Sequence, residues 1–191
     1  MLGVPAFMSE LFFSLLMMKK DLSDLIFKKE LYNKSLNSIY LELCGKRKYD
    51  YSQFLKNLTN TVFQFINSYF QLHLPTPKFV AGKPKDRSKE FWAGQFIYRN
   101  YTRFVGLKKE FNRDWKPRVK IATDYEYTFG EALAIIAHEI LHYYIEYNNF
   151  FDLWDHGPTY RFFMWSWNLD FKELGFPKIK LGAQIIGTRN D

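Results

Sequence analysis

The sequence predicts an α+β fold in which helices come first, short strands follow, and a central helix comes after the strands. Three observations predict it. The 191 residues are 47% hydrophobic and 25% charged, which allows a buried core and is not the composition of a disordered chain. Apolar residues at helical spacing in the first 72 positions give way to short strand-like runs between residues 78 and 123. A long, mostly apolar helix then begins near residue 128.

The N-terminal part is expected to be helical. Residues 7–45 are predicted to form two helices with a break near residues 19–21, the second of which covers residues 22–43. A polar stretch from Gly45 is predicted to be a loop. We therefore assign residues 1–50 to an N-terminal helical extension and residues 51–191 to the main domain.

The main domain is expected to begin with a third helix over residues 51–72, which ends before two prolines because proline cannot continue a helix. Short strands are predicted at residues 78–81, 90–98 and 118–123. Thr128 and Glu131 fit a capping box, which marks the start of the central helix. That helix should end near Asn148, and a last helix is predicted over residues 159–168.

The N-terminus does not have the pattern of an export signal or a membrane anchor. It lacks a basic start, has Glu10 inside its apolar run, and shows no small-residue cleavage site. The run is also shorter than the ~20 residues that span a bilayer. The single cysteine, Cys44, cannot form an internal disulfide, which suits a reducing compartment. We therefore expect an intracellular monomer that does not bind membranes.

The central helix contains the sequence HEILH at residues 138–142. A spacing of four places His138 and His142 one turn apart on the same face, where both can reach one metal ion. Glu139 would then lie beside the metal as a general base that takes a proton from water. Burying these groups without a partner would be costly, so a zinc ion is favoured over two core histidines without metal.

A catalytic zinc ion needs a third protein ligand and one open position. His156 is the expected third ligand, because Gly157 and Pro158 let the chain turn sharply before the next helix. Three of the four histidines of the chain, His138, His142 and His156, also lie close together in the sequence. Asp152 and Asp155 are alternative ligands.

Two further residues are set aside. Glu146 is four residues beyond His142, which is too far along a straight helix to share the ion with His138. His73 is expected to be an ordinary surface or helix-end residue.

HEILH and the run HGPTYRFF, which begins at His156, together resemble the SprT-like metallopeptidases, the family that includes the Spartan proteases. LPTPKFV at 74–80 and WAGQF at 92–96 are similar to strand-leading elements of that family, and the resemblance covers about residues 52–170. It implies a small zincin-like domain with helices packed on a short antiparallel sheet. It also implies a zinc peptidase that cleaves proteins trapped on DNA, with His138, His142 and His156 as ligands and Glu139 as the base.

Many members of that family carry a Cys-rich zinc ribbon, which one cysteine cannot form, so any DNA contacts would have to come from elsewhere. Residues 78–120 contain 13 Lys or Arg and 4 Asp or Glu, whereas residues 121–160 contain 7 Asp or Glu and no Lys or Arg. Basic residues interleaved with aromatics are typical of a groove for single-stranded DNA or a DNA junction, and a solvated surface is the alternative. The expected contacts are Lys83, Lys85, Arg87, Lys89, Arg99, Arg103, Lys108, Lys109 and Arg113.

Three functions remain open from the sequence. The first is a DNA-associated zinc endopeptidase that cleaves DNA-bound or DNA-crosslinked proteins, in which Tyr143, Tyr144 or Tyr160 could assist. The second is a zinc peptidase of soluble substrates without DNA dependence. The third is a non-catalytic nucleic-acid-binding module that contains zinc.

Overall fold

The computed structural model describes residues 22–44, 51–83, 93–97, 101–105, 108–111, 117–150, 152 and 155–181, with side chains for all of these except 44, 101–105 and 108–111. The helix predicted before residue 20 lies outside the described residues. The chain combines helices with a small sheet, which confirms the α+β class. The elements are η1 (Lys29–Leu31), α2 (Leu36–Cys44), α3 (Tyr51–Tyr69), β1 (Lys78–Gly82), β2 (Gly94–Ile97), β3 (Tyr101–Val105), β4 (Lys108–Phe111), β5 (Arg118–Ala122), α4 (Phe129–Tyr147) and α5 (Pro158–Leu174).

Three of the strands form one mixed sheet in the order β1–β5–β2. β1 runs parallel to β5, with Phe79 opposite Val119. β2 runs antiparallel to β5, with Phe96 opposite Val119. The expected antiparallel sheet is therefore wrong at the β1–β5 pair. Parallel strands require a long crossover, and the chain between residues 82 and 118 is long enough to supply one.

β3 and β4 form a separate two-stranded antiparallel sheet that the sequence pattern does not predict. Phe104 pairs with Lys109 and Val105 with Lys108, and the register shifts after Tyr101. In this part of the chain, charged and apolar residues do not alternate regularly. The period of two that identifies a strand is therefore weak here.

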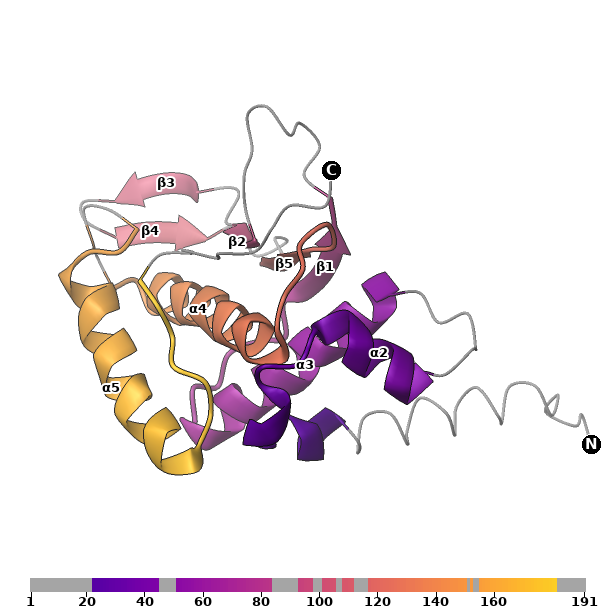
Figure 1. Ribbon diagram of the computed structural model, residues 1–191. Coiled ribbons are helices and arrows are strands. Elements are labelled where there is room, and N and C mark those ends of the chain that lie inside the picture. The colour runs from indigo at the N-terminus through magenta and orange to yellow at the C-terminus, as the bar shows by residue number, and fades with distance from the viewer. Residues whose placement is uncertain are drawn as a thin grey trace, which may run out of the picture.

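α3 and α4 cover one face of the three-stranded sheet (Figure 1). α3 packs along β1, α4 packs along β2 and β5, and the two helices contact each other. α5 packs against α4 as well. α4 is thus enclosed by the sheet, α3 and α5, and most of its apolar side chains are buried, as its composition predicts.

Residues 22–44 contribute to the same core. Leu22, Ile26, Leu36 and Ile39 are all buried and belong to the cluster that includes the apolar residues of α3 and α4. This segment therefore packs directly on the elements that surround the central helix.

The single helix predicted over residues 22–43 is wrong. The chain forms a helical turn at residues 22–25, then η1, and α2 begins only at Leu36. The Leu36 N–H donates to the Tyr127 carbonyl at 2.9 Å, and the Phe129 N–H donates to the Lys34 carbonyl at 2.9 Å. Because the Leu36 N–H donates to Tyr127, it cannot also donate to the carbonyl four residues before it, and a continuous helix over residues 22–43 is interrupted here.

α4 begins as the sequence predicts. The Glu131 N–H donates to the Thr128 hydroxyl oxygen at 3.3 Å, and the Thr128 N–H donates to the Glu131 carboxylate at 2.9 Å. This capping box satisfies backbone donors that a helix start leaves free. α5 is longer than predicted and ends at Gly175, whose φ of 74° is the left-handed conformation that glycine adopts without strain. None of the described helices is both long and apolar enough to cross a membrane.

We expect Thr128→Ala to lower the free energy of unfolding by about 1 kcal/mol, because it removes the hydroxyl that accepts from the Glu131 N–H. Thr76→Ala, in the exposed loop between α3 and β1, should change it by less than about 0.5 kcal/mol. Urea unfolding followed by circular dichroism measures both. Equal midpoints for the two variants would contradict a stabilising role of the cap.

Candidate metal centre

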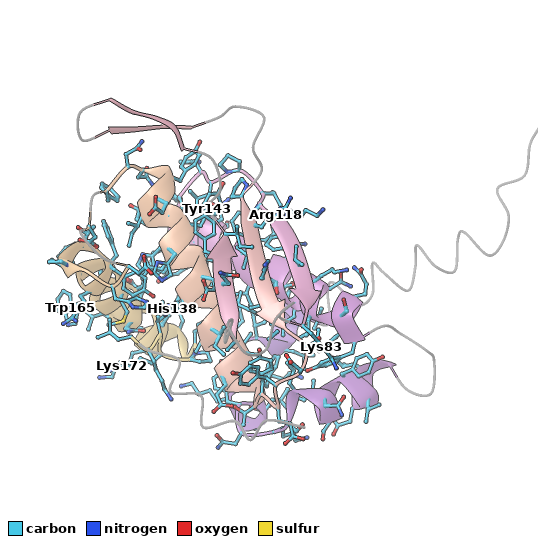
Figure 2. All side chains as sticks on the ribbon, turned by 90° about the horizontal axis from the view of Figure 1, so that it is seen from above. Lys83, Arg118, His138, Tyr143, Trp165 and Lys172 are labelled. Carbon is cyan, nitrogen blue, oxygen red and sulfur yellow. The ribbon has the colours of Figure 1, made fainter. Side chains whose placement is uncertain are left out.

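Three histidines converge between α4 and the start of α5. His138 lies on the side of α4 that faces α5 (Figure 2). His142 lies one turn later on the same side, where both rings contact Tyr160 of α5, and His156 lies just before α5. The Nε2 atom of His142 is 3.1 Å from that of His138 and 3.2 Å from that of His156, and the His138–His156 distance is 3.1 Å. These three residues form the only group among the described residues whose His, Cys, Asp or Glu donors could hold a metal ion.

The loop between α4 and α5 positions His156. The Asp152 carboxylate accepts from the Thr159 N–H at 3.0 Å and from the Tyr160 N–H at 2.9 Å, so it caps the first turn of α5. A side chain at Gly157 would meet the Asp152 carboxylate at 2.6 Å, so only glycine fits at this turn. The Arg161 Nε–H donates to the His156 carbonyl at 3.0 Å. Asp152, an alternative ligand in the sequence, therefore holds the loop and is not in the metal-binding group.

The spacing of the nitrogen atoms fits a metal ion. Two ligand nitrogens at ~2.0–2.1 Å from a tetrahedral zinc ion are about 3.3 Å apart, close to the distances in this group. Three neutral imidazoles without a cation would explain these short distances less well. His138 Nδ1 lies against the Lys180 carbonyl oxygen and therefore carries the proton of that ring, so its Nε2 atom has none. Only His142 and His156 could then place a proton on Nε2, and two protons cannot serve three short contacts between Nε2 atoms. A cation is a partner for all three lone pairs.

His138 is oriented from behind by the backbone. Its Nδ1 atom is 2.9 Å from the Lys180 carbonyl oxygen, which can only accept a hydrogen bond. Nδ1 therefore carries the proton, and Nε2 has the free lone pair that a metal ligand needs. The Tyr160 hydroxyl lies 2.7 Å from the same Nδ1 atom.

The ring of Tyr160 contacts all three imidazoles. Its centroid lies 4.5 Å from that of His142, 4.8 Å from that of His156 and 5.2 Å from that of His138. Of the three tyrosines proposed as helpers, only this one is at the centre. Tyr143 donates to the Pro75 carbonyl at 2.9 Å, on the side of α4 toward the sheet (Figure 2), and Tyr144 packs on Phe163 and Trp167.

The imidazoles are in the state that metal binding requires. Burial lowers the pKa of His138 to about 4 and that of His142 to about 3, and it also lowers the pKa of His156. All three are therefore neutral near pH 7, with lone pairs available without prior loss of a proton.

Glu139 is buried next to this group, with 7% of its surface exposed. Burial raises the pKa of its carboxyl group to about 8, a hydrogen bond from the Phe96 backbone opposes the rise, and the charge of Asp155 adds to it. A neighbouring cation favours the carboxylate and lowers this pKa. Glu139 can approach β2 closely because residue 94 is glycine. A side chain there would meet Ile135 at 2.6 Å and the Glu139 carboxylate at 2.9 Å.

The structure places few of the predicted DNA contacts. Lys83 follows β1 with an exposed side chain. Arg103, Lys108 and Lys109 belong to the β3–β4 ladder, where the side chains are not described. Lys85, Arg87, Lys89, Arg99 and Arg113 lie outside the described residues. His73 is exposed in the loop after α3, as expected.

No family model, curated protein or solved structure matches the chain. The geometry described above is therefore the basis for any functional conclusion.

Three contributors to the site are absent from the sequence-based list: Gly94, the Lys180 carbonyl and Asn168. The Asn168 side chain accepts from the Ile179 N–H at 2.7 Å and donates to the Ile179 carbonyl at 3.0 Å, next to Lys180. The WAGQF run points to Gly94 only through the family resemblance. No sequence pattern shows which backbone carbonyl or amide a distant histidine depends on.

We expect His156→Ala to lower zinc affinity by more than ~100-fold, because loss of an outer-shell partner alone costs 10–100-fold. His73→Ala, which removes an exposed imidazole, should still bind one zinc ion per chain. Mass spectrometry of the metal in dialysed protein measures both. One tightly bound zinc ion per chain in His156→Ala would show that this residue is not a ligand.

We expect Asn168→Ala to weaken zinc binding by about tenfold, since the Lys180 carbonyl would no longer be held against His138. Asn37→Ala, on the exposed face of α2, is the matched control. Competition with a chromogenic chelator measures the affinity, and circular dichroism checks folding. An unchanged affinity in a folded Asn168→Ala protein would remove the positioning role of this residue.

Proposed function

We propose that the protein is a zinc-dependent peptidase. The observation that supports this most is the convergence of three neutral imidazole nitrogens beside one buried carboxylate. Three histidines leave one position of a tetrahedral ion open, which is typical of catalytic rather than structural zinc sites. A structural site would not need Glu139 in the core, where a carboxyl group without a role is costly to bury.

His138, His142 and His156 would hold the ion, which would supply a Lewis acid that polarises a carbonyl group and lowers the pKa of water. The chain's own groups do the remaining work. Glu139 takes a proton from the attacking water and delivers it to the nitrogen of the leaving amine, so that the peptide bond breaks into a carboxylic acid and an amine. Tyr160 and the Lys180 carbonyl keep His138 in the required orientation.

The substrate class and the link to DNA extend this proposal. The resemblance to SprT-like metallopeptidases favours proteins bound or crosslinked to DNA as substrates. Support comes from the positive charge of residues 78–120, part of which lies in the β3–β4 ladder with Arg103, Lys108 and Lys109. Phosphate binding by this region would be strongly salt-dependent. A peptidase of soluble proteins and a non-catalytic zinc module are the alternatives, and the next experiment separates them.

We expect Glu139→Gln to lower the rate of casein cleavage by at least ~100-fold without loss of zinc, because the amide cannot accept the proton of water. Glu146→Gln, the same substitution on the same helix, lies outside the metal-binding group and should retain activity. Gel assays with and without single-stranded DNA, plus a chelator control, measure the rates.

The outcomes distinguish the three functions. Equal rates for Glu139→Gln and the unchanged protein would refute the proposed base. If single-stranded DNA raises the rate of cleavage, the DNA-associated enzyme is supported. If the rate is the same with and without DNA, the peptidase of soluble substrates is supported. A zinc-bound protein that cleaves nothing under either condition leaves the non-catalytic module.

A further inference from the structure

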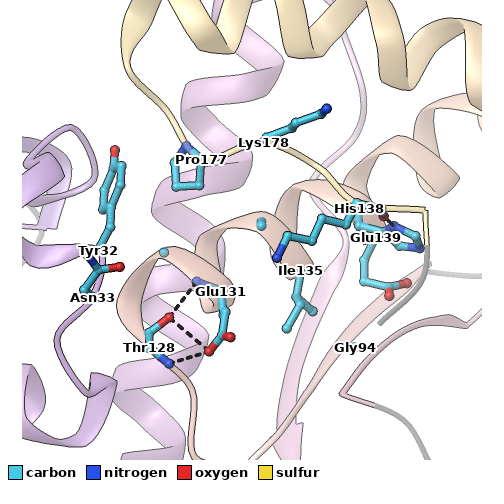
Figure 3. Close-up of a pocket in the computed structure, with 13 residues that line it drawn as sticks. Tyr32, Asn33, Gly94, Thr128, Glu131, Ile135, His138, Glu139, Pro177 and Lys178 are labelled. Atoms are coloured by element: carbon cyan, nitrogen blue, oxygen red, sulfur yellow. Dashed lines mark hydrogen bonds between the residues drawn. The ribbon is translucent and has the colours of Figure 1, made fainter. Parts of the chain in front are cut away.

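A cavity of about 360 Å³ opens beside His138 and Glu139 and extends along α4 toward its N-terminus (Figure 3). Its size is within the range of ligand pockets, roughly 300–1,000 Å³. Ala134 and Ile135 form its floor, one helical turn before the metal centre. Gly94 of β2 and the segment Pro177–Lys180 are on its walls, and Tyr32 is at the far end.

The wall formed by residues 177–180 is held in place. Ile179 is fully buried and makes two hydrogen bonds to the Asn168 side chain, and the Lys180 carbonyl contacts His138. Lys178 and Lys180, on either side of Ile179, are exposed and line the cavity. Because the backbone between them is fixed, the two ammonium groups extend from fixed points on the wall.

The acidic and basic side chains that line the cavity are not paired with one another in the described part of the chain. Glu131, at the far end, already uses one carboxylate oxygen to accept from the Thr128 N–H and hydroxyl group (Figure 3). Glu139 lies at the metal end and is the proposed proton carrier. No ion pair joins Lys178 or Lys180 to an acidic group among the described residues. A ligand in the cavity would therefore meet an apolar floor and two positive charges that are available for pairing.

We propose that this cavity is a substrate subsite that takes a residue bearing a carboxylate, with its methylene groups over Ala134 and Ile135 and its charge at Lys178 and Lys180. The inference rests on the proposed peptidase function. The subsite shares His138 and Glu139 with the metal centre, so its occupant lies next to the peptide bond that is cleaved. The carboxylate can belong to a Glu or Asp side chain or to the C-terminus of the substrate chain.

The test measures binding and does not require turnover. The full chain with Glu139→Gln, loaded with zinc, is titrated against labelled alanine-based peptides that are acetylated and amidated. One peptide has a single Glu, and its partners have Gln or Lys at that position. A fourth has only alanine and a free C-terminal carboxylate, which separates the two sources of the negative charge. Fluorescence anisotropy measures each Kd.

We expect the Glu peptide or the free-carboxylate peptide to bind about fivefold more tightly than the Gln peptide, the size expected of exposed ion pairs. Lys178→Glu with Lys180→Glu should abolish this preference and favour the Lys peptide. Lys28→Glu with Lys172→Glu, which changes the net charge equally at exposed positions outside the cavity, should preserve it. Ala134→Trp should weaken every peptide by filling the floor, with zinc content unchanged.

Equal binding of the Glu, Gln and free-carboxylate peptides would overturn the subsite, as would the same loss of preference in both charge-reversal pairs. Displacement of the peptides by a single-stranded oligonucleotide that depends on Lys178 and Lys180 would assign these lysines to nucleic acid and also overturn it. Cleavage of all peptides at one rate by the unchanged protein would refute the subsite and leave the peptidase intact. Selective binding without any cleavage would support carboxylate binding in the cavity and refute the peptidase.

Discussion

The contacts of 3.1–3.2 Å between three imidazole nitrogens are the constraint on which the rest of this structure depends. Each ring is at least partly removed from water, and this burial lowers its pKa, so that it stays neutral near pH 7. Neutral rings with lone pairs that point at one another repel unless a cation lies between them. The surrounding chain must therefore hold an arrangement that is unfavourable in the absence of metal. The positions of Tyr160, the Lys180 carbonyl and Asp152 are explained by this requirement, since each fixes a ligand or the backbone beside it.

Three separately anchored segments meet at this point. The capping box starts α4, so the register of His138 and His142 is set by a signal ten residues earlier. The Asp152 cap and Gly157 set the start of α5 and with it His156. The Asn168 pair holds the segment after α5 that carries the Lys180 carbonyl. Because each anchor is a local hydrogen-bonding arrangement, the site is preorganised before any ligand binds.

The parts that could be predicted from sequence are those encoded by short-range patterns. The start of α4, its burial, the HEILH spacing and the choice of His156 all depend on residues a few positions apart. The strand order could not be predicted, because the parallel β1–β5 pair joins residues 40 positions apart, such as Lys78 and Arg118. The break in the helix expected over 22–43 comes from backbone bonds to residues 127–130, about a hundred positions away. Gly94 makes room for Glu139, 45 positions later, and Asn168 holds Ile179, 11 positions later, so local periodicity does not reveal either role.

The segment after α5 connects the metal centre to the neighbouring cavity. The Lys180 carbonyl orients His138, while the side chain of the same residue lines the cavity. A ligand that displaced this backbone would also disturb the tautomer of His138, whereas one that pairs only with the ammonium group would not. A ligand is therefore selected at this wall by side chains, because the Lys180 carbonyl is already bonded to His138. The same logic applies to Gly94, where any side chain that enlarged the wall would collide with Glu139.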